Sequence, residues 1–217
     1  MSMPMEPYLK LSTSQSPVTA QEFAVMHDIP YCKSVGSLVY VLLVTHLNIM
    51  FMVGRLLKFL ERLRQPPWEA LRHVSQYLKG TLDWELTYGE WEELLMGWVD
   101  MYGSQEEDRH IITGYAFLIN GSAVSWNSKQ QVLIMLSMTK GEYVASTHAA
   151  KEALWLQLLI LEVFDDNLNL TSLFSNNQSA IALLKDHQYH VHTKHINIQC
   201  HFIHWVITTD LSISFTA

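Results

Sequence analysis

The sequence predicts an α/β fold in which a mixed sheet is flanked by helices and preceded by a small α-helical segment. Helical periodicity dominates residues 31–80, and short apolar runs typical of strands follow from residue 94. A long helix-forming stretch, Leu136–Glu162, then separates two of these runs. The order strand, hairpin, strand, long helix, strand, helix favours a mixed sheet with helices on its faces.

The composition allows a large core and argues against a broadly basic surface. The chain has 217 residues, 49% of them hydrophobic, and a formal net charge of −7. A protein that holds nucleic acid through its phosphates usually carries a basic face, so this average charge disfavours that class. One basic run remains, consisting of Lys58, Arg62, Arg64, Arg72 and Lys79. We interpret it as the solvated side of two helices, and a local nucleic-acid-binding patch is the alternative.

The two cysteines, Cys32 and Cys200, form neither a metal motif nor a disulfide framework. We expect reduced cysteines of an intracellular chain, in the cytoplasm or nucleus, with a single disulfide as the alternative. The first residues do not follow the charged, apolar, small-residue order of a signal peptide.

Val35–Gly54 contains no Asp, Glu, Lys or Arg and is about long enough to span a bilayer. Thr45, His46 and Asn48 interrupt it, and no comparable segment follows. We therefore predict a buried helix and no membrane contact, with a membrane helix as the alternative.

The first part of the chain is predicted to be helical after a polar lead-in. We expect residues 1–30 to be poorly structured apart from a short helix at Ala20–Met26, where Thr19 and Glu22 have capping-box spacing. Three helices should follow, with Pro66-Pro67 separating the last two: Tyr31–Thr45, Asn48–Leu63 and Pro67–Gly80.

The second part is predicted to alternate between strands and helices. Asn120-Gly121 between two apolar runs is a strong hairpin signal. The predicted strands are Trp84–Tyr88, Leu94–Asp100, Ile112–Ile119, Ala123–Trp126, Gln131–Leu136, Leu170–Ser175 and Leu211–Phe215. Besides the long helix, we expect helices at Asn176–Lys185 and His195–Val206.

The long helix has a start signal and a core-facing stripe. Thr139 and Glu142 have the spacing of a capping box. Beyond Leu154 the helix is apolar on almost all sides, so we expect that end to be buried. The stripe consists of Tyr143, Ala150, Ala153, Leu154, Leu158 and Leu161.

Three polar residues stand where strands end or helices begin. Asp100 ends a predicted strand, Glu142 lies in the first turn of the long helix, and Asn176 follows Ser175. Such positions meet in one cleft in sheets of this kind. Carboxylates gathered there would hold Mg²⁺, and a pair of such ions could activate water against a phosphodiester.

Many short motifs resemble those of copia-type retrotransposon Pol polyproteins, in order and over nearly the whole chain. The resemblance implies that residues 31–90 are the helical C-terminal part of a reverse transcriptase. Residues 91–217 would then be a ribonuclease H-like domain, which cuts RNA in an RNA–DNA hybrid. The motifs are Val35–Tyr40, Trp68–Leu71, Tyr77–Thr81, Thr113–Tyr115, Ser125–Gln130, Ala149–Ala153, Asn177–Ile181 and His192–Ile196.

The family's catalytic set is four carboxylates that hold Mg²⁺. The resemblance places the first at Asp100, in Gly97-Trp98-Val99-Asp100, and the second at Glu142. The third position is Asn176, and the fourth belongs to a closing helix after the last strand, which this sequence does not include. The chain also begins downstream of the reverse transcriptase's own metal-binding motif. We therefore expect remnant metal ligands, no stably bound Mg²⁺, no cleavage, and weak or no nucleic-acid binding.

Two further functions and several structural roles compete with this interpretation. The chain could be a non-catalytic nucleic-acid-binding module, or a nuclease completed by another chain. Glu142 could act only as a cap, Asp100 as a solvated turn residue, and Asn176 and Asn177 as helix N-caps. A zinc site is a further hypothesis, on six histidines: His187, His190, His192, His195, His201 and His204.

Overall fold

The computed structural model describes residues 3–6, 9, 11, 28–61, 65–89, 93–103, 110–134, 138–164, 171–185, 202, 205–206 and 213–216. The chain divides into two compact units, Met1–Leu86 and Thr87–Ala217. Assigning the first unit to a reverse transcriptase stays a prediction, because the division says nothing about ancestry.

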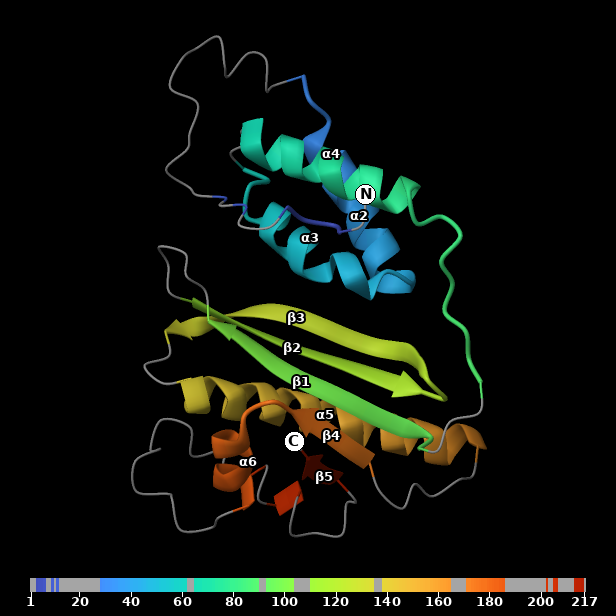
Figure 1. The fold of residues 1–217 in the computed structure, drawn as a ribbon, viewed down its shortest axis with the longest axis vertical. Helices are drawn as coiled ribbons and strands as arrows, with labels where there is room; N and C mark the ends of the chain where they lie inside the picture. Colours follow the sequence, from blue (N-terminus) through green and yellow to red (C-terminus); the bar gives the residue numbers. More distant parts are fainter. Residues whose placement is uncertain are drawn as a thin grey trace. The chain divides into compact units, whose positions relative to one another are not determined.

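The first unit is helical, as predicted (Figure 1). Its described helices are α2 (Tyr31–Val44), the 3₁₀ helix η1 (Leu47–Ile49), α3 (Met50–Leu57) and α4 (Gln65–Lys79). Their buried side chains recur at helical spacing, for example Val35, Leu38 and Leu42 along α2. Within the described residues, no helix combines the length and apolar character needed to cross a bilayer.

Two boundaries in this unit differ from the prediction. The second helix was predicted to reach Leu63, but α3 ends at Leu57. α4 begins at Gln65, two residues before the predicted start at Pro67, so Pro66 as well as Pro67 lies in its first turn. Proline is tolerated in a first turn because the backbone N–H groups there have no intrahelical partner.

The second unit is built on a five-stranded mixed sheet in the order β3-β2-β1-β4-β5. β1, β2 and β3 are antiparallel neighbours, whereas β4 runs parallel to both β1 and β5. This confirms the predicted mixed sheet flanked by helices. The strands are β1 (Leu95–Gly103), β2 (His110–Ile119), β3 (Ser122–Ile134), β4 (Thr171–Ser175) and β5 (Ile213–Thr216).

The turn between β2 and β3 has the predicted chemistry. Asn120 has φ 48° and Gly121 has φ 81°, the left-handed conformation that a tight hairpin turn requires at both positions. β3 is one continuous strand, not the two strands that were predicted. The predicted strand Trp84–Tyr88 is absent, since these residues form no regular structure and both aromatic side chains are exposed.

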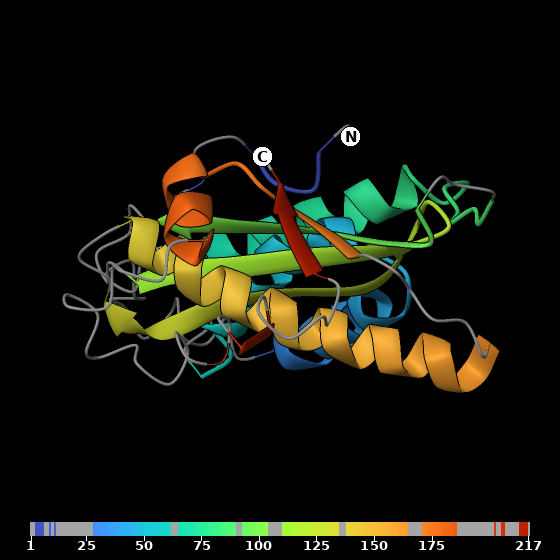
Figure 2. The ribbon, with the colours of Figure 1, turned by 90° about the horizontal axis from the view of Figure 1, so that it is seen from below.

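Two helices, α5 (Met138–Phe164) and α6 (Gln178–Lys185), cover one face of the sheet (Figures 1 and 2). Alternate strand residues such as Val99, Phe117 and Leu173 point into this core. Small residues of α5, Ala149, Ala150 and Ala153, are fully buried and allow the helix to pack closely on the strands.

The C-terminal end of α5 is not buried, so that prediction was wrong. Trp155, Leu158, Val163 and Phe164 are each more than half exposed. Apolar composition on all sides indicates a covered helix only when the fold supplies something to cover it. The predicted helix Ala20–Met26, most of His195–Val206, and the histidines proposed for zinc lie outside the described residues.

Candidate functional site

Asp100 lies within β1, three residues before the strand ends. The alternative that it is a turn residue was therefore wrong. Its side chain is exposed, and one carboxylate oxygen, Oδ1, accepts a hydrogen bond of 2.8 Å from the backbone N–H of Met101. The register pairs Val99 with Ser175, so Asp100 is level with the residue that follows β4. That residue is Asn176.

Asn176 turns its amide toward Asp100. Its Nδ2 donates to Asp100 Oδ1 at 3.4 Å. The helix-capping role belongs instead to Asn177, whose Oδ1 accepts from the backbone N–H of Ala180 at 3.0 Å. The prediction that both asparagines cap a helix therefore holds for Asn177 and is wrong for Asn176.

Glu142 reaches the same place from α5. Its side chain is 3% exposed, and Oε2 has no hydrogen-bond partner among the described residues. The backbone N–H of Met101 on β1 lies close enough to this carboxylate to lower its pKa. The predicted capping box places Thr139 at the N-cap, but α5 already includes Met138, so Thr139 lies inside the helix and this interpretation of Glu142 is wrong.

The pKa of Glu142 is raised from 4.5 to about 7, chiefly by burial and next by the nearby charge of Asp100, while the backbone N–H of Met101 acts to lower it. An ionised carboxylate loses its hydration when it is buried, so the proton stays bound to a higher pH. Glu142 therefore keeps its proton to a higher pH than an exposed glutamate does.

Gly141 allows this approach and was not identified from the sequence as part of the site. A Cβ at this position would come within 2.9 Å of the Met101 side chain and 3.2 Å of Ile111. The absent side chain lets the N-terminal end of α5 lie against β1 and β2, which brings Glu142 beside Asp100. The signal in the sequence was a glycine next to a candidate ligand inside a helix, where glycine is otherwise unfavourable.

The residues present do not fit a two-metal Mg²⁺ site. The three predicted positions, together with Met138 and Gln178, line one open depression. It holds two carboxylates, one of them with a raised pKa, and an amide N–H directed at the other. Across the described part of the chain, no three His, Cys, Asp or Glu side chains come together to hold a metal ion.

Comparison with known proteins identifies the family. The chain is 36% identical, over 210 residues, to the retrovirus-related Pol polyprotein of transposon TNT 1-94 from Nicotiana tabacum. That match covers 96% of this chain. The chain belongs to the copia-type retrotransposon Pol polyproteins. The corresponding polyprotein of transposon RE2 from Arabidopsis thaliana is 29% identical over 175 residues.

The chain spans a small part of these Pol polyproteins, 16% of the tobacco protein and 12% of the Arabidopsis protein. A further relative is the secreted RxLR effector protein 161 of Plasmopara viticola, 35% identical over 60% of this chain and 94% of that protein. The same sequence pattern thus also occurs outside full-length polyproteins. No family model matches the chain.

Among solved structures, the chain is similar to LC11-RNase H1, with a TM-score of 0.41 and 14% identity over 56% of this chain and 81% of that one. It is also similar to the foamy viral protease-reverse transcriptase, with a TM-score of 0.45 and 13% identity over 92% of this chain and 41% of that one.

Proposed function

We propose that residues 91–217 are a copia-type ribonuclease H-like domain that no longer cleaves RNA in RNA–DNA hybrids, and that residues 31–90 are the helical end of the reverse transcriptase before it. The observation that carries the loss of cleavage is the amide of Asn176 at the third ligand position. Mg²⁺ is held by oxygen ligands, and its positive charge favours carboxylates. Asn176 supplies no charge, and its N–H occupies a lone pair of Asp100 that a metal ion would need.

The protonation of Glu142 supports the same conclusion. A metal ion would have to displace the proton that this carboxylate retains up to about pH 7. Two-metal cleavage of a phosphodiester requires a pair of ions that stabilise both the attacking and the leaving oxygen. With two carboxylates and one amide, the described site has too little negative charge to fill both positions.

A cleavage assay tests this proposal. The full chain is incubated with a labelled RNA–DNA hybrid and either Mg²⁺ or Mn²⁺, beside an Asp100→Asn variant prepared in the same way. We expect no metal-dependent product from either protein. Cleavage by the natural chain that disappears in Asp100→Asn would overturn the proposal.

Restoring the third carboxylate should restore metal binding. We expect Asn176→Asp to raise the affinity for Mn²⁺ at least about tenfold, since even changes in groups outside the ligand shell alter metal affinity by 10- to 100-fold. Isothermal titration at pH 8 would measure the change. Gln178→Glu adds the same charge in the same depression and is the matched control. Equal gains in both variants would show that charge alone, not this position, determines binding.

A second candidate function is nucleic-acid binding without cleavage, favoured by a basic group on α5 and β3. Lys151 and Lys129 lie close enough to His148 to lower its pKa, after burial, which is the largest cause. Salt-dependent gel-shift titrations of the hybrid would test this function, with Lys129→Gln combined with Lys151→Gln as the variant. Binding that this variant weakens, with a shallower salt dependence, would support it.

A further inference from the structure

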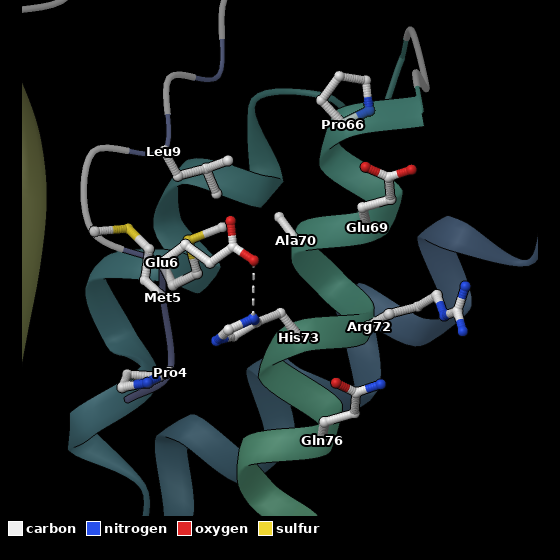
Figure 3. A pocket seen from close by; sticks show the side chains of 11 residues that line it. Pro4, Met5, Glu6, Leu9, Pro66, Glu69, Ala70, Arg72, His73 and Gln76 are labelled. Atoms are coloured by element: carbon white, nitrogen blue, oxygen red, sulfur yellow. Dashed lines mark ion pairs between the residues drawn. The ribbon is translucent and has the colours of Figure 1, made fainter. Parts of the chain in front are cut away.

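The N-terminal segment Met3–Glu6 lies across the first helical unit as a strap. Its residues Pro4, Met5 and Glu6, with Leu9, border a cavity of about 230 Å³ whose other side is formed mainly by α4 (Figure 3). Leu11, farther along, is 5% exposed. The contacts between the strap and the helices are specific, and two basic side chains make them.

Arg55 of α3 forms the first connection. Its guanidinium is largely buried and donates a hydrogen bond of 3.2 Å to the backbone carbonyl of Leu9. A second contact runs to the sulfur of Met5 at 3.8 Å. Because a guanidinium keeps its charge at all physiological pH values, this connection does not change with pH.

His73 of α4 forms the second connection, and both of its ring nitrogens face acceptors. Nε2 is 3.1 Å from the carbonyl oxygen of Met3, and Nδ1 is 3.7 Å from a carboxylate oxygen of Glu6. A carbonyl can only accept, so Nε2 must carry a hydrogen. In the neutral ring, Nδ1 would then direct a lone pair at the Glu6 carboxylate. Only the imidazolium, with a hydrogen on each nitrogen, is attracted to both partners.

We propose that Met3–Glu6 is a pH-sensitive strap, held on α4 by the doubly protonated form of His73 and loosened when that ring loses a proton. Histidine changes charge in the range between about pH 5 and 8, so the change falls within the physiological range. The direction follows from the two contacts: a ring that has lost one hydrogen is no longer attracted to both acceptors, so raising the pH shifts the population toward the released state.

Other charged groups border His73 and do not reverse this argument. Glu69 lies one helical turn before it on α4 and accepts a hydrogen bond from Gln65. Arg72, the adjacent residue on α4, and Arg55 on α3 contribute positive charge that does not titrate in this range. Among the described residues of this cluster, Glu6 and Glu69 are the carboxylates and His73 is the histidine.

Hydrogen exchange of the full chain at pH 5.5 and pH 8 tests the proposal. Exchange of the N-terminal peptide is measured by mass spectrometry and divided by the intrinsic rate at each pH. We expect protection about two- to fivefold lower at pH 8, the size of one partly exposed ion pair. Protection of the α2 peptide at both pH values serves as the internal reference for an intact unit.

Two variants and one control identify the group responsible. His73→Gln retains a donor for the Met3 carbonyl but cannot be charged, and Glu6→Gln removes the opposite charge. Both should give protection that no longer depends on pH. His46→Gln changes a histidine of the same unit that contacts Thr45 and should behave like the natural chain. A pH dependence that persists in His73→Gln, with the α2 peptide still protected, would overturn the proposal.

Discussion

At the residue scale, the protonation of Glu142 connects the candidate site to the stability of the fold. The folded-state pKa of about 7 is above the value of 4.5 expected when the chain is unfolded. Between these values the unfolded state has already lost the proton that the folded state retains. Stability therefore falls as the pH rises from 4.5 toward 7, and it stays reduced above that range.

Glu142→Gln should remove this pH dependence. The amide cannot ionise, so we expect the variant to match the natural chain at pH 4.5 and to exceed its unfolding free energy at pH 8 by at most about 3 kcal/mol. Urea unfolding at the two pH values, followed by circular dichroism, measures the difference. Glu162→Gln, an exposed position on the same helix, should leave the pH dependence unchanged. An equal gain from both variants would contradict the assignment to Glu142.

The sequence was sufficient to select the three site positions but not their roles. Asp100 and Asn176 could be placed together because neighbouring strands determine which residues are level. The environment of Glu142 could not be predicted, because a glutamate near a helix start has the same local pattern whether it caps the helix or is buried against a strand. Only the approach of β1 to Gly141 distinguishes the two cases.

At the element scale, Gly97 determines how closely the centre of β1 packs. A Cβ at this position would lie 2.5 Å from Phe117 Cε1 and 2.6 Å from Leu173 Cδ2. Both neighbours are fully buried, so neither has free space in which to move. The glycine therefore serves the packing of three adjacent strands.

Gly97→Ala should destabilise the second unit by about 1–3 kcal/mol, the usual effect of overpacking a core. Thermal unfolding followed by circular dichroism would measure it. Gly89→Ala is the control, because a Cβ there meets nothing within 4 Å. If both variants lose the same stability, the general preference for glycine is responsible and the packing argument fails.

The elements that the sequence predicted well are those whose signal is local. The hairpin at Asn120-Gly121 and the start of α2 depend on a few adjacent residues. Two predictions failed: a strand at Trp84–Tyr88 and a buried C-terminal end of α5. Both required another part of the chain to pack against the segment, and local periodicity contains no information on such packing.

At the scale of the whole molecule, the two units have separate cores. The second unit contains all five described strands together with α5 and α6, and its core draws on residues from Leu94 onward. We expect a fragment of residues 87–217 to fold without the first 86. Its near-ultraviolet circular dichroism and its hydrogen-exchange protection in α5 should match those of the same residues in the full chain. Loss of protection in α5 would show that the first unit is required.

The hydrogen bond between Asn176 and Asp100 also bears on the stability of the fold. A carboxylate at position 176 would place a third acid beside two that already repel each other, and its repulsion would weaken the fold. The amide replaces that repulsion with a favourable contact. Active sites commonly sacrifice stability for chemistry, and under the function proposed above the amide at this position relaxes that conflict. A chain that has lost cleavage, as proposed, would therefore retain this sheet and its helices more easily than an active enzyme could.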